Sequence, residues 1–272
     1  MIRCCEVSTA CMARWHLSEF LSEKGKNLKG GESVDQKEQD TFLECERHRV
    51  FLLLMMVGGF YGAYTYTVRG GVFCNAQTAN FVLLAMALGN LHWGKALYYL
   101  IPMTAYLLGT VVSEAIAKPV RRYGIIRWDT MLIIIEIVLV IILGFVPDDA
   151  PYQITQVAIN FIASMQYNTF RQAEKVPMAT TFCTNHLRQI GIALVKVGEG
   201  KEESKFLKRI SIHGRMLLFF VLGGTASAAL CRFFGGKALF FALIPLGILL
   251  FDLLYADIKL EKGDFFRKPA GH

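Results

Sequence analysis

The sequence predicts an all-α polytopic membrane protein with six transmembrane crossings plus two re-entrant or broken helices, arranged as two halves of inverted topology. Of its 272 residues, 54% are hydrophobic and 19% are charged, and the mean hydropathy is +0.40. Soluble domains carry about 25% charged residues. The apolar residues gather in long runs between residues 50 and 256, and nearly all Lys and Arg lie between the runs. This pattern excludes a soluble enzyme, a disordered chain and a disulfide-stapled secreted domain.

The polar segments outside the runs define the domain organisation. Residues 1–49 are polar and do not follow the pattern of a signal peptide, so we expect a cytoplasmic N-terminal tail. Residues 50–146 form the first membrane repeat, residues 151–256 the second, and residues 257–272 a cytoplasmic C-terminal tail. We therefore expect a multi-pass protein of the cytoplasmic membrane with both termini in the cytoplasm.

Net charge and cysteine usage limit the partners. The net charge of +7 follows from the positive-inside rule, because basic residues orient membrane proteins. We therefore expect the lipid bilayer and a small-molecule solute as partners, and no nucleic acid. The seven cysteines form no recurring Cys-x-x-Cys pair, which favours free thiols over a metal site. We expect no cofactor and no metal, and a homo-oligomer is an open alternative.

Eight apolar stretches lie along the chain. They are residues 50–68, 72–90, 96–117, 126–146, 152–170, 178–195, 216–234 and 238–256. A spanning helix needs about 20 mostly apolar residues. The third, fourth, seventh and eighth stretches meet this length, and the first qualifies although it is rich in Gly and Tyr. The fifth has polar residues at helical spacing, and such a face must lie against protein or water rather than lipid.

The second and sixth stretches differ from ordinary spans. Stretch 72–90 follows Gly70-Gly71, stretch 178–195 follows Pro177, and each has a polar first half and a more apolar second half. Irregular backbone at membrane depth is tolerated only where it is buried in protein or lines a cavity. We therefore expect both stretches to enter the membrane and return on the same side.

The distribution of charge supports this topology. If all eight stretches cross, nine basic residues fall outside and Asp148-Asp149 falls inside. If the second and sixth stretches return instead, the basic residues outside are Arg69, Lys95, Arg232 and Lys237. The acidic turn then lies outside and the basic loop 196–215 inside. The positive-inside rule favours this second arrangement.

The two interrupted stretches occupy corresponding places, since each follows the first crossing of its half. Three crossings per half give duplicated halves opposite orientations in the membrane. A short sequence echo, Phe73-Cys74 against Phe182-Cys183, agrees with duplication. Paired interrupted segments are the best sequence indication of a transporter's binding site.

Each interrupted stretch is expected to consist of an extended limb followed by a half-helix. We expect Thr78 to cap the first half-helix, and Thr184 or Asn185 to cap the second. Free N–H groups and the helix dipole at these points attract anions or carbonyl oxygens. The candidate substrate-binding residues are Asn75, Gln77, Thr78, Asn80, Gln166, Asn168, Thr181, Thr184, Asn185, His186 and Arg188.

Several of these residues have a plainer interpretation. Asn and Thr in membrane helices also join helices by hydrogen bonds. His186 is either a substrate contact or proton-responsive group, or a structural histidine bonded to a carbonyl. Arg188 either holds an anionic solute or extends to the cytoplasmic surface. Glu136, in the middle of an apolar run, is the candidate for proton coupling, and a neutral packed carboxyl is the alternative.

The motifs around the interrupted stretches point to a known family. Gly59-Phe60-Tyr61-Gly62-Ala63, Gly70-Gly71-Val72-Phe73 and Thr78-Ala79-Asn80 form one block, and Met165-Gln166-Tyr167-Asn168, Ala179-Thr180-Thr181 and Thr184-Asn185-His186 form another. Together they resemble the two conserved blocks of the bacterial YoaK-like membrane proteins, which have Thr-Gly-Asn where this chain has Thr78-Ala79-Asn80 and Thr184-Asn185-His186. That family is a domain of unknown function, so the resemblance implies the membrane fold and no substrate.

Two hypotheses for function follow. The chain carries no Walker loop, dinucleotide-binding glycine fingerprint, zinc-protease motif or hydrolase elbow, so we expect that it is not an enzyme. The leading hypothesis is a transporter or channel for a small polar or anionic solute, bound between two half-helix N-termini at mid-membrane. The alternative is a non-transporting membrane assembly or sensory protein whose cytoplasmic tail and loop 196–215 bind a partner.

Overall fold

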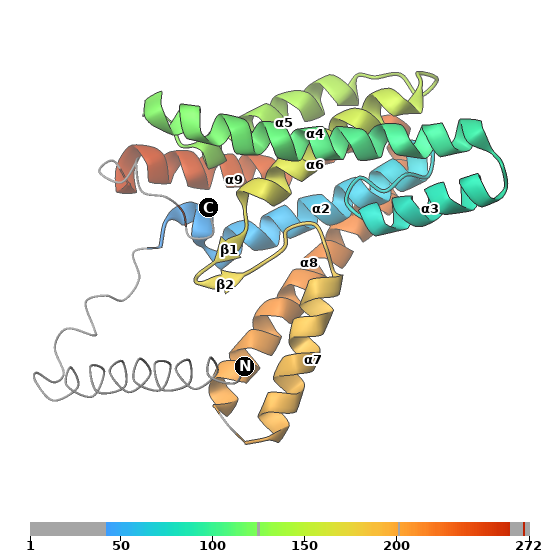
Figure 1. Ribbon diagram of the computed structural model, residues 1–272. Coiled ribbons are helices and arrows are strands. Elements are labelled where there is room, and N and C mark those ends of the chain that lie inside the picture. The colour runs from blue at the N-terminus through green and yellow to red at the C-terminus, as the bar shows by residue number, and fades with distance from the viewer. Residues whose placement is uncertain (1–41, 124–125, 201, 262–268, 270–272) are drawn as a thin grey trace, which may run out of the picture. The chain divides into compact units, whose positions relative to one another are not determined.

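The computed structural model describes residues 42–123, 126–200, 202–261 and 269 (Figure 1). The chain divides into two units, residues 1–41 and residues 42–272, and the first lies outside the described residues. Most of both predicted tails lies outside them as well. Residues 42–49, which the sequence places in the N-terminal tail, belong to the second unit, where Leu43 and Cys45 are buried.

The described part of the second unit is mainly helical, which confirms the all-α prediction. Its elements in chain order are η1 (Glu44–Glu46), α2 (His48–Val68), α3 (Gln77–Gly89), α4 (Trp93–Tyr123), α5 (Trp128–Gly144), α6 (Tyr152–Thr169), β1 (Gln172–Ala173), β2 (Val176–Pro177), α7 (Thr184–Gly198), α8 (Glu203–Phe234), η2 (Gly235–Ala242), α9 (Leu243–Tyr255) and the π-helical turn η3 (Ala256–Leu260). Strands β1 and β2 form a short antiparallel hairpin.

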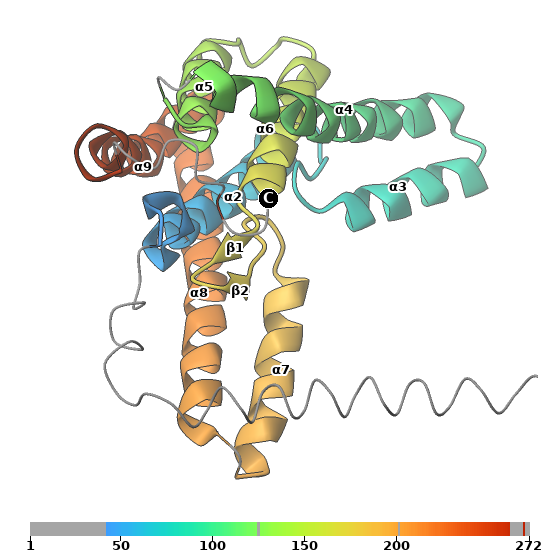
Figure 2. The same cartoon turned by 60° about the vertical axis from the view of Figure 1, so that its left-hand side comes forward.

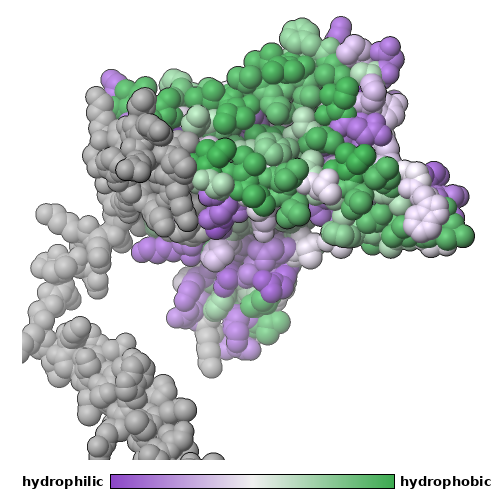
Figure 3. All heavy atoms as spheres, turned by 45° about the horizontal axis from the view of Figure 1, so that its top comes forward, coloured by the Kyte–Doolittle hydropathy of each residue, from purple (hydrophilic) through white to green (hydrophobic). Residues whose placement is uncertain are grey.

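Within the described residues, three helical segments are long and apolar enough to cross a membrane: His48–Val68, Trp93–Ala117 and Glu203–Leu260. Their length and composition agree with a membrane protein. Large hydrophobic side chains face outward along the helices that surround the fold, for example Leu107 on α4 and Ile142 on α5. Figure 3 shows this hydrophobic surface over the body of the unit, and hydrophilic side chains on the part that protrudes below it.

The two interrupted stretches contain the short helices α3 and α7, of 13 and 15 residues. Each is followed by a tight turn and then by a long helix, so that α3 lies against α4 and α7 against α8 (Figures 1 and 2). The capping predictions are wrong. Helix α3 begins at Gln77 and α7 at Thr184, so Thr78, Thr184 and Asn185 lie inside the first turns, and neither N-cap residue makes a side-chain capping bond.

The long helices pack in two pairs, α2 with α8 and α4 with α6. Glycines allow the first pair to approach closely, because a Cβ at Gly59 would overlap the carbonyl of Phe220 on α8, and a Cβ at Gly223 would overlap the carbonyl of Met56 on α2. A Cβ at Gly109 on α4 would likewise overlap the carbonyl of Phe161 on α6. Small residues at helix crossings are a common way to join membrane helices by close packing.

A buried arginine holds three turns together at one end of the unit. Arg69, which follows α2, has no exposed surface and donates to two carbonyls of the turn after α5, including that of Pro147 at 3.2 Å. It also pairs with Asp148 at 3.5 Å, and Asp148 accepts a hydrogen bond from the Gly236 amide at 2.9 Å. Tyr64 donates to the Gly236 carbonyl. The turns after α2, α5 and α8 therefore lie at the same end, which we name the Arg69 end.

A second buried arginine organises the opposite end of the same helices. The Arg127 guanidinium, between α4 and α5, lies 3.4 Å from Asp129, 3.4 Å from Glu261 and 3.9 Å from Asp257. Glu261 also accepts a hydrogen bond from the backbone N–H of Glu44, just before α2. Burial acts to lower the pKa of Arg127, but the carboxylates, Asp129 foremost, raise it above its usual value. The start of α2, the α4–α5 turn and the end of α9 thus meet at one charged cluster, which we name the Arg127 end.

The close crossing of α2 and α8 predicts a sharp difference between two glycine-to-alanine substitutions. Gly223→Ala pushes a methyl group into the Met56 carbonyl and is expected to destabilise the fold by about 1–3 kcal/mol, as overpacking does. Gly247→Ala on α9 meets nothing within 4 Å and is expected to leave stability unchanged or raise it slightly. Thermal unfolding in detergent measures both, and equal melting temperatures would contradict this packing.

Candidate functional site

Helix α2 has a glycine at its centre that contacts both interrupted segments. Asn75, in the limb that precedes α3, donates from Nδ2 to the Gly58 carbonyl at 2.9 Å. A Cβ at Gly58 would lie 2.9 Å from the carbonyl oxygen of Thr180, in the limb that precedes α7. One turn later, a Cβ at Gly62 would lie 2.9 Å from Oδ1 of Asn75. The two limbs therefore meet at the middle of the 21-residue helix.

The first limb turns back at Gly70 and Gly71, which have φ angles of +81° and +74° that favour glycine. The limb is tied to α3 by Asn80, which is fully buried. Its side chain donates to the Phe73 carbonyl at 2.6 Å and accepts from the Phe73 N–H at 3.1 Å. Asn80 thus provides hydrogen-bond partners for the N–H and carbonyl of Phe73, which no strand or helix pairs. Irregular backbone inside a membrane protein requires such partners.

Gln77 connects this segment to the second half of the chain. Its side chain donates to the Cys74 carbonyl at 3.1 Å and to Oδ1 of Asn160 on α6 at 2.9 Å. It also accepts a hydrogen bond from Asn80. Asn160 belongs to the polar face of the fifth stretch, so that face lies against protein as the sequence predicts.

The second limb brings unpaired hydroxyl groups into the core. Thr180 and Thr181 are 0% and 2% exposed, and neither hydroxyl oxygen has a hydrogen-bond partner of ordinary geometry among the described residues. The hydroxyl of Tyr106 on α4 lies beside Thr181 and is likewise buried without a partner of ordinary geometry within the described part of the chain. Unpaired buried hydroxyls are uncommon and costly, so this cluster is suited to bind a polar group.

His186 contacts α8 rather than the other limb. Its Nε2 lies 2.9 Å from the Ala179 carbonyl and its Nδ1 lies 2.8 Å from Nδ1 of His213. A carbonyl only accepts, so Nε2 of His186 carries the proton and Nδ1 accepts from His213. Both rings are fully buried. This geometry matches the structural alternative, a histidine bonded to a carbonyl.

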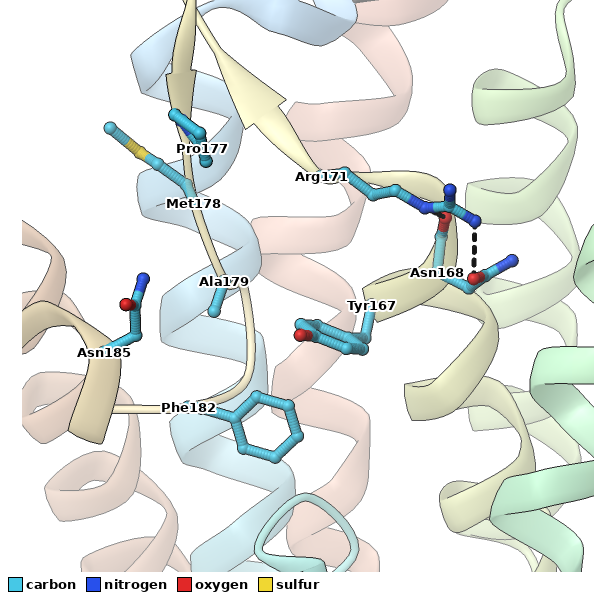
Figure 4. Close-up of a pocket in the computed structure, with 8 residues that line it drawn as sticks. All are labelled: Tyr167, Asn168, Arg171, Pro177, Met178, Ala179, Phe182 and Asn185. Atoms are coloured by element: carbon cyan, nitrogen blue, oxygen red, sulfur yellow. Dashed lines mark hydrogen bonds between the residues drawn. The ribbon is translucent and has the colours of Figure 1, made fainter. Parts of the chain in front are cut away.

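A cavity of about 410 Å³ lies between the end of α6 and the second limb (Figure 4). Figure 4 shows Tyr167 and Asn168 on one side and Met178, Ala179 and Asn185 on the other. Its full lining is Tyr167, Asn168, Arg171, Pro177, Met178, Ala179, Phe182 and Asn185. The cavity is close to the Arg127 end, because Trp128 donates from Nε1 to Thr169 at the end of α6.

The polar wall of this cavity is preorganised. Arg171 donates to both the carbonyl and Oδ1 of Asn168 at 2.6 Å, and to Glu114 on α4 at 2.8 Å. Asn168 also donates to Ser113 on α4. The guanidinium therefore has a set orientation, and its charge is partly compensated by Glu114. Opposite, Phe182 packs edge-to-face against Tyr167, which gives the cavity an apolar floor.

The remaining candidate residues are more dispersed. Thr78 and Thr184 are exposed on the first turns of α3 and α7, and Arg188 is exposed and donates to Asn185 at 3.1 Å. Gln166 is buried and donates to the Leu54 carbonyl on α2. The structure thus brings Asn75 and Thr181 together, because both lie against Gly58. It also places Asn168 and Asn185 in the lining of one cavity.

Glu136, the proton-coupling candidate, lies fully buried on α5. Neither carboxyl oxygen has a hydrogen-bond partner of ordinary geometry within the described residues. The Tyr61 hydroxyl from α2, itself fully buried, lies next to it. A carboxyl group in such surroundings is costly to ionise unless a neighbouring group stabilises the charge.

Sequence reasoning missed Tyr106 and the two aromatic residues that line the cavity, Tyr167 and Phe182. Tyr106 lies within an otherwise apolar span, where a hydroxyl group is the one signal that could have marked it. The aromatic pair carries no such signal, because Tyr and Phe are common in membrane helices. No group of three or more His, Cys, Asp or Glu residues suited to a metal occurs in the described residues.

The comparisons with known proteins give a family and no function. No curated protein matches the chain, and no solved structure does. One family covers residues 50–251, and it is described as "Protein of unknown function (DUF1275)". The match begins in the first turn of α2 and ends within α9, so it includes both interrupted segments and the cavity. The chain belongs to the DUF1275 family of proteins of unknown function.

Proposed function

We propose that the chain is a transporter or channel of the cytoplasmic membrane for a small polar or anionic solute, which binds where the two interrupted segments meet beside α2. The observation that carries this proposal is the contact of both limbs with Gly58, next to buried hydroxyl groups that lack hydrogen-bond partners of ordinary geometry in the described part of the chain. Interrupted segments that meet at the middle of a membrane fold are the usual construction of a solute site in transporters.

The arrangement of the turns supports six crossings. With the N-terminus inside, α2 leads outward, and the turns after α2, α5 and α8 all belong to the outer side in a six-crossing topology. Arg69, Asp148 and Gly236 of these three turns are in mutual contact. If all eight stretches crossed, the turn that carries Asp148 would lie on the side opposite to Arg69. The Arg69 end is therefore the outer end in this proposal, and the Arg127 end is the inner end.

The pairing of helices supports two halves of inverted topology. In chain order, α2, α3, α4 and α5 correspond to α6, α7, α8 and α9. The contact of α2 with α8 then corresponds to that of α6 with α4, and the α3–α4 hairpin to the α7–α8 hairpin. The glycine contacts follow the same relation, with Gly223 on α8 and Gly109 on α4 each against a carbonyl of the paired helix.

The cavity gives the proposed solute a route from the inner side. A solute that enters it meets Asn168, Arg171 and Asn185 first. The second limb separates the cavity from the core, with Ala179 and Phe182 lining the cavity and Thr181 buried beside Tyr106. The ion pair with Glu114 partly compensates the positive charge of Arg171. The cavity therefore suits a neutral polar solute or a small anion better than a multiply charged one. In this proposal Glu136 remains the candidate for proton coupling, with Tyr61 as its neighbour.

The buried hydroxyl of Thr181 provides a sharp test of the solute site. Thr181→Val keeps the shape and removes the hydroxyl, so we expect at least a fivefold lower flux with an unchanged melting temperature. Proteoliposomes are tested by light scattering for entry of glycine, glycerol, sodium acetate and sodium phosphate. Thr104→Val is the matched control, because Thr104 is exposed on α4 and bonded to the Ile101 carbonyl. Normal flux in Thr181→Val would refute the site, and no flux above protein-free liposomes would favour the assembly or sensory role.

Cysteine labelling in whole cells tests the six-crossing topology. In a background without the native cysteines, Lys95→Cys and Asp149→Cys are expected to react with a membrane-impermeant maleimide from outside, because the start of α4 and the α5–α6 turn belong to the outer side in this proposal. Glu199→Cys is expected to react only after lysis, and it lies inside in the eight-crossing topology too, so it controls for leakage. Protection of both Lys95→Cys and Asp149→Cys in intact cells would show that the eight-crossing topology is right.

A variant that retains Cys45 and lacks the other native cysteines serves as a check on this labelling. Its thiol is buried before α2, and burial raises its pKa well above the usual range. Because the thiolate is the reactive form, Cys45 is expected to label slowly even after lysis at neutral pH. Comparing a Cys45-only variant with Glu199→Cys measures this difference, and equal labelling rates would contradict the burial of Cys45.

A further inference from the structure

A second cavity, separate from the one beside α6, lies between the β1–β2 hairpin and the first turns of α8. Its volume is about 280 Å³, close to the lower limit of about 300 Å³ typical of small-ligand sites. Its lining is His48, Glu174, Lys175, Val176, Pro177, Lys205, Phe206, Lys208, Arg209 and Ile212. Four of these side chains are Lys or Arg and one is acidic, so the cavity is strongly basic.

The acidic group and one of the lysines in this cavity already have partners. Glu174 accepts from the His48 N–H and pairs with the His48 ring at 3.2 Å. Lys205 pairs with Glu202, which does not line the cavity. Lys175, Lys208 and Arg209 make no ion pair with a described residue. Lys175 lies over the Phe42 ring, with its Nζ 5.8 Å from the ring centroid. Within the described part of the chain no carboxylate neutralises these three charges, so they suit an anionic ligand.

Two nitrogen atoms at this cavity are shielded from solvent and lack partners. They are Nε of Arg209 and Nδ1 of His48, neither of which has a hydrogen-bond partner among the residues that the structure describes. A buried guanidinium N–H without an acceptor costs free energy, and an anionic oxygen would satisfy it with a strong charge-assisted bond. The Nε2 of His48 donates to the Glu174 carboxylate, so its Nδ1 is an acceptor in the neutral ring. The site thus offers one directed donor, the Arg209 Nε–H, as well as general positive charge.

The cavity lies near the Arg127 end, where α2 begins. The Glu174 N–H donates to the carbonyl of Glu46, which lies two residues before the start of α2. On α8 the lining residues end at Ile212, one turn before the apolar part that begins at Met216. In the proposed topology this is the inner boundary of the membrane, where anionic lipid headgroups gather and basic cavities between helices bind them.

We propose that this cavity is an anion site that takes a phosphate-bearing ligand, either the phosphodiester headgroup of an acidic lipid or free phosphate. Arg209 and Lys208 from α8 hold the phosphate oxygens, and Lys175 closes the site from the β1–β2 turn. Arg and Lys together suit phosphate, because Arg gives directed donors and Lys a compact charge. The site is distinct from the solute path and goes beyond the proposed transport function.

Direct binding to the full-length protein in neutral detergent tests this site. Inorganic phosphate is titrated by calorimetry at low ionic strength, and phosphatidylglycerol is tested against phosphatidylcholine by native mass spectrometry. The Lys208→Ala/Arg209→Ala variant is expected to bind the relevant probe at least tenfold more weakly. Arg232→Ala/Lys237→Ala is the matched control, since it removes one Lys and one Arg that are exposed outside the cavity, and it is expected to bind as the unaltered protein does.

Each outcome decides the proposal. If phosphate binds saturably and the cavity variant loses this binding, the ligand is a free anion. If phosphatidylglycerol binds in preference to phosphatidylcholine and the cavity variant loses this preference, the ligand is the lipid. Lys175→Ala, on the exposed turn, is expected to weaken binding about threefold and decides the matter if the double variant misfolds. Equal binding by the cavity and control variants, or no binding of either probe, would overturn the site. Thr181→Val is expected to bind phosphate or lipid as strongly as the unaltered protein does. If this variant loses that binding, the basic cavity is not separate from the solute site, whatever the flux result.

Discussion

The contact of Gly58 with both interrupted segments is the constraint on which the rest of the described structure depends. Two stretches of chain without regular hydrogen bonding lie within a helical fold, and each of their backbone groups needs a partner because the surroundings are apolar. A side chain at Gly58 or Gly62 would occupy the space that Asn75 and Thr180 use. The missing side chains on α2 therefore allow the limbs to enter, and Asn75 and Asn80 satisfy the backbone that enters with them.

The same helix also determines how the rest of the unit assembles around the limbs. One face of α2 contacts the limbs, while Gly59 allows α8 to approach so closely that the backbones are in contact. At its ends, α2 leads into the two arginine clusters, Arg69 at one and Arg127 with its carboxylates at the other. Buried ion clusters contribute little net stability, because desolvation offsets their attraction, but loss of one partner is costly. Their effect is to specify which turns lie at which end.

Two cavities of different chemistry flank the second limb and the hairpin that precedes it. The one beside α6 combines an aromatic floor with amide groups and an arginine that is already paired. The one beside α8 is basic, and three of its cations have no ion-pair partner among the described residues. Pro177 lines both, so the β1–β2 hairpin separates them. This difference in charge compensation is the reason to assign them different ligands, a small solute to the first and a phosphate group to the second.

The sequence by itself determined that the chain is helical, where the apolar stretches lie, and that two of them are interrupted. Composition and hydropathy suffice for this, because the cost of burying polar backbone and charge is a local property of each stretch. It also identified Asn75, Asn80 and Thr181 as polar residues placed among apolar neighbours. The capping role of Thr78 was wrong, because the backbone of the limb, held by Asn80, determines where α3 starts. The capping role of Thr184 was wrong because α7 already includes Thr184 and its N-cap is Cys183. Only the tertiary structure decided that His186 binds His213, that Tyr106 lies beside Thr181, and that Lys175 joins Arg209 around one cavity. These pairs are 27 to 75 residues apart, and contacts at such separation depend on how helices cross, which periodicity along one chain does not encode.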